Sequence, residues 1–301
     1  MKSKNIHFSL LIMLVAAIAV GCVQADSLVN NHNPQLQTTP TPSPDQKLHT
    51  QITTTDPGPA LPTLSPLPET EDEKHEQTGR IITLGGVEYC TSLTELDLLG
   101  YELKDEDIVP LTYMTNLTAL KLDSEHISDI TPLAGLANLT ELWLNSRLVN
   151  DSLSDLTPLS ELTGLVTLVI RGFLISDITP LSNLTNLNEL YITHTRISDI
   201  APLSGLTGLH VLCVSYSNVS DLTPLKTLTD LRRLELICNR ISDVSPLSSL
   251  VSLYYMALSF NEISDISPLS GLNNLEGLDL WDNPVSDWSP VDHIERVLGR
   301  P

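Results

Sequence analysis

The chain has 301 residues and a formal net charge of −21, from 37 acidic and 16 basic side chains. This acidity excludes the basic footprint by which proteins bind nucleic acids, so we expect no nucleic-acid partner. The four cysteines have no C-x-x-C spacing and predict neither a zinc site nor a disulfide framework. We therefore expect no metal and no other cofactor.

Residues 1–22 have the pattern of a secretory signal. A basic start precedes an apolar stretch from Phe8 to Val20, which is too short for a membrane-spanning helix. The following Gly21-Cys22 completes a sequence that resembles a bacterial lipobox, in which the cysteine is lipidated and becomes the mature N-terminus. Cys22 is the predicted lipidation site, and we expect an extracytoplasmic protein anchored by lipid to the bacterial cell membrane. If this is an ordinary cleavage site instead, the protein is secreted.

Residues 23–78 have a different composition. They hold nine of the 20 prolines, many Thr, Gln, Asn and Ser residues, and no visible period. Such a segment cannot bury a core, so we expect a disordered, extended stalk. The alternative is a low-complexity leader without a function.

From residue 93 onward one short phrase, of the type SDITPL, recurs eight times. The interval between its aspartates is 26 residues once and 22 residues otherwise. The aspartates are Asp129, Asp155, Asp177, Asp199, Asp221, Asp243, Asp265 and Asp287. A leucine-rich period of this length is the signature of leucine-rich repeats.

One copy, 187–208, shows what a repeat builds. Leu190-Tyr191-Ile192 alternates as a strand does, and Pro202 suits the start of a short helical turn. Asp199, just before that turn, can accept hydrogen bonds from its free N–H groups. An alternative use of the aspartates is calcium binding. Capping is favoured, because the dense D-x-D-x-D clustering of calcium loops is missing.

Stacking is required, because a lone repeat cannot bury its leucines. We expect nine repeats over residues 93–290, with an N-terminal cap over 79–92 and a C-terminal cap over 291–301. The first cap should be a hairpin of 81–84 and 87–90, and helical spacing from Val291 to Leu298 should cover the last repeat. The predicted fold class is an α/β solenoid: a right-handed leucine-rich repeat superhelix with a concave parallel β-sheet and short convex 3-10 or α turns.

The pattern LTEL–L–ISDITPL–L resembles the 22-residue repeats of internalin-type bacterial leucine-rich repeat proteins, over roughly residues 80–301. The resemblance implies that the concave sheet, and in some members its edges, binds a protein partner, here a host or an envelope protein. The family's asparagine after the strand is present only at Asn239, Asn261 and Asn283. Equivalent positions hold Tyr101, Glu125, Arg147, Phe173, Thr195 and Ser217, so we expect less regular turns in the N-terminal half.

Residues that flank the core leucines of each strand should point to the concave surface. Aromatic residues make up only 4% of the chain, yet six of them fall at or beside this surface. Together with two arginines they are the predicted partner-binding residues: Trp143, Arg171, Tyr191, Tyr216, Arg233, Tyr255, Phe260 and Trp281. Trp, Tyr and Arg dominate binding hot spots. The alternative is that exposed aromatics merely favour strands.

No pattern in the sequence indicates an enzyme. His194 lies one strand away from Cys213, but no orienting group or oxyanion-hole motif accompanies the pair. We therefore expect a monomeric, non-catalytic recognition or adhesion module that binds a protein, with a glycan-bearing surface as the other ligand left open. The alternative is a structural or self-associating envelope protein without one specific ligand. The four-residue insertion near Asn150 is either a contact loop or a tolerated loop extension.

Overall fold

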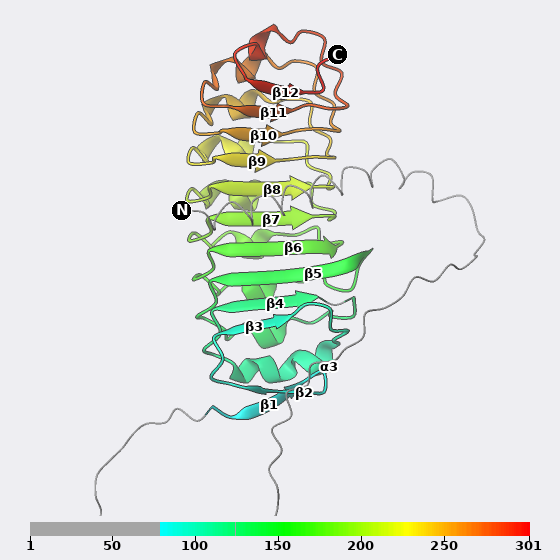
Figure 1. The fold of residues 1–301 in the computed structure, drawn as a ribbon, viewed down its shortest axis with the longest axis vertical. Coiled ribbons are helices and arrows are strands. Elements are labelled where there is room, and N and C mark those ends of the chain that lie inside the picture. Colours follow the sequence, from blue (N-terminus) through cyan, green and yellow to red (C-terminus); the bar gives the residue numbers. More distant parts are fainter. Residues whose placement is uncertain (1–78, 124) are drawn as a thin grey trace, which may run out of the picture. The chain divides into compact units, whose positions relative to one another are not determined.

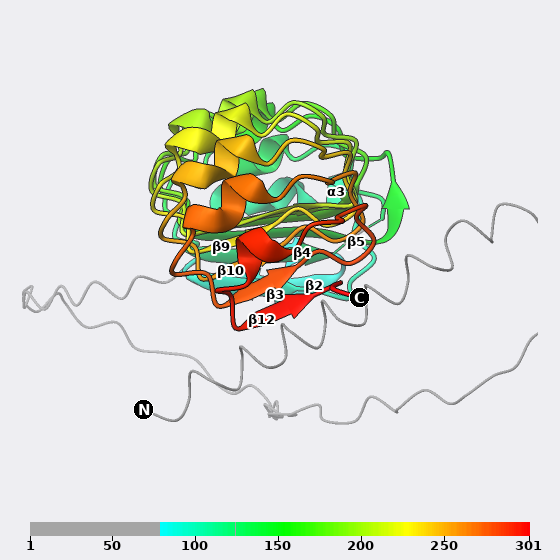
Figure 2. The same ribbon diagram turned by 90° about the horizontal axis from the view of Figure 1, so that it is seen from above.

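A computed structural model describes residues 79–123 and 125–301. The predicted signal segment with Cys22 and the predicted stalk lie outside the described residues. Within the described part, two strands form an antiparallel hairpin and ten form one parallel sheet, stacked in chain order (Figure 1). Seen along the stack, the helical turns form one layer and the sheet forms the opposite layer (Figure 2).

The elements follow the repeat. The strands are β1 (Ile81–Leu84), β2 (Val87–Cys90), β3 (Glu95–Leu98), β4 (Ala119–Asp123), β5 (Glu141–Asn150), β6 (Thr167–Phe173), β7 (Glu189–Thr193), β8 (Val211–Ser215), β9 (Arg233–Glu235), β10 (Tyr255–Ala257), β11 (Gly277–Asp279) and β12 (Arg296–Leu298). The helical elements are α3 (Asp105–Ile108) and the 3-10 turns η1 (Val109–Tyr113), η2 (Thr131–Leu133), η3 (Thr157–Leu159), η4 (Thr179–Leu181), η5 (Ala201–Gly205), η6 (Thr223–Thr227), η7 (Ser245–Ser249), η8 (Ser267–Gly271) and η9 (Ser289–Val291).

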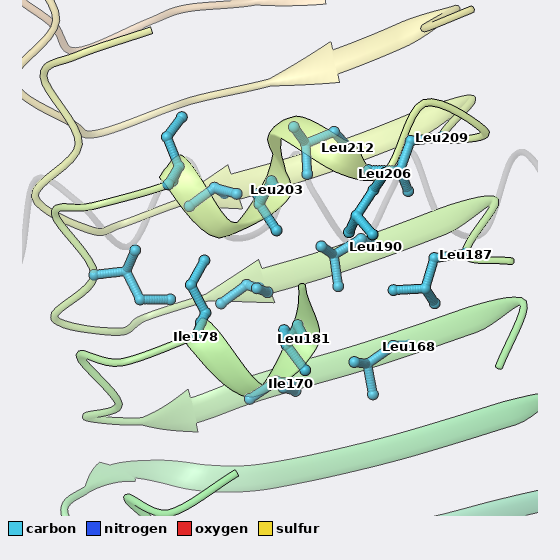
Figure 3. Packing of buried hydrophobic residues seen from close by; sticks show 14 of the residues in the cluster. Leu168, Ile170, Ile178, Leu181, Leu187, Leu190, Leu203, Leu206, Leu209 and Leu212 are labelled. Carbon is cyan, nitrogen blue, oxygen red and sulfur yellow. The ribbon is translucent and has the colours of Figure 1, made fainter. Parts of the chain in front are cut away.

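The core lies between these two layers. In the copy 187–208, the seven apolar residues of the pattern are each at most 1% exposed. Leu190 comes from the strand β7, Leu203 from the turn η5, and Leu206 from the residue that directly follows this turn (Figure 3). Equivalent leucines are in register along the sheet, as in the pairs Leu168 with Leu190 and Leu190 with Leu212. The predicted leucine-rich repeat solenoid is confirmed.

The aspartate of each SDITPL phrase caps the 3-10 turn that follows. Its Oδ1 accepts a hydrogen bond from the backbone N–H two residues on, at 2.8 Å in seven copies and 2.9 Å in the eighth. This donor is at the first residue of the turn, where no intrahelical acceptor exists. Proline follows at the next position, where its missing N–H costs nothing. The predicted capping role is confirmed.

The turns after the strands depend on asparagine only in the C-terminal repeats. Asn261 Oδ1 accepts from the backbone N–H of Ile241 at 3.0 Å, and its Nδ2 donates to the Leu236 carbonyl at 2.9 Å. Asn239 and Asn283 make the equivalent bonds.

The same turn conformation nevertheless also occurs in repeats that lack this asparagine. A non-glycine residue with left-handed φ, between 54° and 59°, lies just beyond the strand in five consecutive repeats: His194, Tyr216, Cys238, Phe260 and Asp282. In two of the repeats without asparagine, the equivalent residues Thr195 and Ser217 form a hydroxyl pair, with oxygens 2.8 Å apart. The expectation of less regular turns wherever the asparagine is missing was therefore too broad, because the repeats with Thr195 and Ser217 keep the left-handed residue.

The main irregularity is at β5. The repeat with four extra residues extends this strand to ten residues and shifts its register against β6 between Asn145 and Asn150. Gly172 on β6 faces this bulge with a φ of 81°. A Cβ at Gly172 would lie 2.5 Å from the carbonyl oxygen of Ser146, so only glycine permits this close approach.

The two ends of the stack differ in how they are closed. The expected hairpin is present, with Ile81 paired to Cys90 and with positive φ at both turn glycines. At the C-terminus Val291 and Ile294 are buried and Val297 packs against the core, as expected of a cap, but the expectation that this cap is helical was wrong. Residues 296–298 form β12, which pairs parallel to β11, because the open edge of β11 has backbone groups that need partners.

Gly172→Ala should destabilise the solenoid. A residue with a Cβ pays about 1–2 kcal/mol for the left-handed conformation alone, so the free energy of unfolding in urea should fall by at least that amount. Gly205→Ala is the matched control, because nothing lies within 4 Å of its added Cβ and its φ is not left-handed. It should be neutral or slightly stabilising. Equal losses in the two variants would contradict this account of the bulge.

Acid should destabilise the fold through the capping aspartates. Hydrogen bonds from the residue two positions on lower the pKa of Asp155, Asp177, Asp221, Asp265 and Asp287. Because the folded pKa lies below the unfolded value of about 3.9, their stabilisation is fully present above that value. It is lost as the pH falls through the folded pKa.

Replacing all five by asparagine keeps an oxygen acceptor but removes the titrating carboxyl. Urea unfolding as a function of pH should therefore show a smaller acid loss in this variant than in the wild type. If both proteins lost stability equally on acidification, other groups would be responsible.

Candidate functional site

The open face of the sheet, which we call the concave face, carries side chains in columns. The middle column lies between the two core residues of each strand, and its members are adjacent in the register: Asp97, Lys121, Trp143, Val169, Tyr191, Cys213, Glu235, Ala257 and Asp279. The first column lies two residues earlier on each strand, and the third column two residues later. This geometry follows from the alternation of side chains along a strand.

The eight predicted partner-binding residues do not share one column. Trp143 and Tyr191 lie in the middle column, Arg233 and Tyr255 in the first, and Arg171 and Trp281 in the third. Tyr216 and Phe260 lie beyond the strand ends, in the column of left-handed residues. These two aromatics therefore lie at the edge of the concave face.

One cluster lies on β4 and β5. The Lys121 ammonium is 4.5 Å from the centre of the Trp143 ring and 3.5 Å from a carboxylate oxygen of Glu141. The cation over the ring and the ion pair hold the lysine over the indole. Both lysine and glutamate remain partly exposed, so a partner can still contact this cluster.

A second cluster lies on β7 to β10. Arg233 forms an ion pair with Glu235 on its own strand, with 2.6 Å between Nε and Oε1, and its guanidinium carbon is 5.1 Å from the centre of the Tyr255 ring. Burial works to lower the pKa of Arg233, but the charge and hydrogen bond of Glu235 outweigh it, so the pKa is raised. The Tyr191 hydroxyl donates to Glu189 at 3.0 Å. The charge pair is buried, since Arg233 is 7% and Glu235 is 4% exposed, so the cluster presents its aromatic rings rather than these charges.

The residues His194 and Cys213 do not have the properties of a catalytic pair. Burial, followed by the charge of Glu235, raises the pKa of Cys213, which disfavours the reactive thiolate. Burial and the charge of Arg171 lower the pKa of His194. The imidazole stacks on Tyr216, with ring centres 4.3 Å apart and planes at 7°. The geometry assigns His194 to an aromatic stack at the edge of the face.

The sequence analysis missed the partners of the predicted residues. Lys121 lies 22 residues before Trp143, one repeat away, so the repeat length alone could have placed them side by side. Glu235 lies two residues after Arg233, on the same face of the same strand. Their ion pair follows the alternation rule but needs a side-chain conformation that the pattern does not specify.

A small pocket lies at the C-terminal ends of the first strands. Its volume is about 40 Å³, and its lining is Gly100, Tyr101, Glu102, Asp123, Glu125, His126 and Arg147. No group of three or more His, Cys, Asp and Glu side chains in residues 79–123 and 125–301 is arranged to hold a metal ion. No helix in those same ranges has the length and apolar character needed to cross a membrane.

Comparisons with known proteins agree with this geometry. A family model described as Leucine Rich repeats (2 copies) matches residues 163–205 and 185–227. A search of curated protein sequences gave no match.

Among solved structures, an internalin (InlF) of Listeria monocytogenes is 35% identical with a TM-score of 0.64, over 70% of this chain and 63% of that one. The chain thus spans less than two thirds of the length of that protein. An internalin C2 of the same organism is 35% identical with a TM-score of 0.58, over 64% of this chain and 84% of that one. The functional domain of InlJ, also of L. monocytogenes, is 22% identical with a TM-score of 0.55, over 69% and 44%, and shares the fold. The repeat, the stacked parallel sheet and this identity together establish that the chain belongs to the internalin-type leucine-rich repeat proteins.

Proposed function

We propose that this protein is a non-catalytic recognition module that binds a protein partner through the concave face. The observation that carries the proposal is the register of the sheet, which aligns Trp143 and Tyr191 in one column and Arg233 and Tyr255 in another. Trp, Tyr and Arg are the residues that most often dominate binding energy. Membership in a family of protein-interaction modules supports the same conclusion.

The size of the face suits a protein ligand. Ten strands about 4.8 Å apart give a strip roughly 43 Å long, which can cover the ~800 Å² that each partner contributes to a standard interface. The pocket described above is small, about 40 Å³, and lies at the edge of this face. An extended strip with aromatic side chains fits a folded protein surface better than a small molecule.

The charge of the two clusters adds selectivity. In both clusters a cation lies against an aromatic ring and beside a carboxylate, Lys121 with Glu141 in one and Arg233 with Glu235 in the other. Because these cations are already paired, a partner gains little from a bare negative charge. The arrangement favours a partner with apolar or aromatic side chains for the rings, and with polar groups for Lys121 and Glu141, whose charges remain partly exposed.

We further propose that the module is presented outside the cytoplasm on a stalk of residues 23–78, anchored by lipid at Cys22. The support is the sequence alone: small residues precede the cysteine at the end of an apolar run, and a proline-rich polar segment follows. Each buried CH₂ of an acyl chain contributes about 0.8 kcal/mol to membrane binding, so several chains give stable anchoring. The net charge of −21 favours a monomer over self-association.

Replacing Trp143, Tyr191 and Trp281 together by alanine should abolish capture of the partner in affinity pull-down with the wild-type protein as reference. The matched control replaces Val109, Tyr113 and Val251, which are 52–59% exposed and lie outside the concave face; it should capture normally. Urea unfolding and light scattering establish that each variant is folded and monomeric. Capture that persists in a folded concave-face variant would show that the partner binds elsewhere.

Cys22→Ala should move the protein from the membrane fraction to the soluble fraction after cell lysis, because the lipid attachment site is gone. Cys90→Ala, which removes a different cysteine, should leave the partitioning unchanged. Identical membrane partitioning of the wild type and Cys22→Ala would exclude the lipid anchor without affecting the proposal for the concave face.

A further inference from the structure

The irregular repeat projects a finger from the flank of the solenoid. Its four extra residues carry β5 beyond the ends of the neighbouring strands (Figures 1 and 2). We call residues 146–150 the edge finger. It lies on the side where the strands end, away from the columns of the concave face.

Hydrogen bonds hold the edge finger in one conformation. Ser146 Oγ donates to the Leu148 carbonyl at 2.6 Å, and Asn150 Nδ2 donates back to Ser146 Oγ at 2.8 Å. Asn150 Oδ1 accepts from both the hydroxyl and the backbone N–H of Ser152, and the Asn150 carbonyl accepts from the N–H of Leu174. A contact made by this segment therefore costs little conformational entropy.

The tip of the finger is apolar and open to solvent. Leu148 is 63% exposed, more than any other large hydrophobic side chain in the described part of the chain, and the adjacent Val149 is 54% exposed. Single exposed apolar residues are common on protein surfaces. Two adjacent ones, displayed on a rigid projection that the regular repeat does not need, indicate a contact surface.

The charged side chains of the pocket beside the edge finger determine which ligand charge is attracted to this part of the surface. Arg147, at the base of the finger, is held by Asp123, with 3.1 Å between Nε and Oδ2, and lies against Gly100. The pocket also contains Glu102 and Glu125, and neither of these carboxylates forms an ion pair within the described residues. Tyr101, 40% exposed, completes the wall. The pocket has more negative than positive charge and offers acceptors to a cation.

This charge selects among the possible occupants. A second copy of the chain would bring its own excess of negative charge, since the net charge is −21, and an anionic membrane surface would be repelled for the same reason. A basic protein surface is attracted, and it gains most where the attraction coincides with the apolar tip.

We propose that the edge finger and the carboxylates beside it form a second docking surface, separate from the concave face, for a protein segment that presents a lysine or arginine next to an apolar side chain. The basic group enters the pocket toward Glu102 and Glu125. The apolar side chain covers Leu148 and Val149. The occupant thus carries both features within a few residues of one another.

A peptide selection tests this surface directly. The probe is a phage-displayed library of random peptides, selected on the immobilised full chain and then tested on two variants, Leu148→Ser/Val149→Ser and Glu102→Gln/Glu125→Gln. The expected result is a class of peptides that pair a basic with an apolar residue, bind more weakly at high salt, and lose about tenfold or more in affinity on each variant.

Two controls complete the design. Val109→Ser/Val251→Ser removes equally exposed apolar groups elsewhere, at 53% and 52% exposure, and should bind the selected peptides as the wild type does. Trp143→Ala tests the concave face and should also leave their binding unchanged. The proposal is overturned if no such peptide class is selected or if binding survives either substitution pair. Equal loss on Trp143→Ala would show that the surface is not separate.

Discussion

The leucines of one repeat can be buried only by the repeats on either side of it, and the rest of the structure depends on this constraint. Each copy has about seven apolar side chains, worth roughly 1.5–3 kcal/mol apiece when buried, and no partner of its own for them. Neighbouring copies must therefore match in register, as Leu190 does with Leu168 and Leu212. Once the leucines are aligned, the intervening side chains are aligned as well. The columns of the concave face are a consequence of the core.

Most of the fold could be predicted from the sequence, because the same spacing of apolar residues recurs in every repeat and each copy indicates the same buried positions. The period predicted the solenoid, and the proline in each turn fixed where capping acceptors such as Asp199 had to lie. Strand β12 could not be predicted in this way. Its three residues carry no repeat pattern, and they pair because the edge of β11 is open. The left-handed turns at His194 and Tyr216 were also missed, because tertiary hydrogen bonds rather than a glycine determine them.

For the candidate site, too, the sequence pattern predicted some features and could not predict others. The alternation of side chains along a strand predicted that Trp143 and Tyr191 face outward. The register of the sheet places them in one column, two strands apart. The side-chain contacts were beyond the reach of the pattern, because the lysine over Trp143 and the glutamate beside Arg233 depend on rotamers. The two clusters and the edge finger use different parts of the frame. The clusters use positions that every repeat leaves free, whereas the finger interrupts the repeat itself.

The capping aspartates have an effect beyond the turns they stabilise. One carboxylate per repeat, repeated eight times beside the row of 3-10 turns, forms a line of like charge along the molecule. Its members influence one another: the charge of Asp177 opposes the ionisation of Asp155, and Asp287 does the same to Asp265. Such a line attracts mobile cations and repels acidic surfaces. The turn layer therefore disfavours close approach by other acidic surfaces, including that of a second copy of this chain.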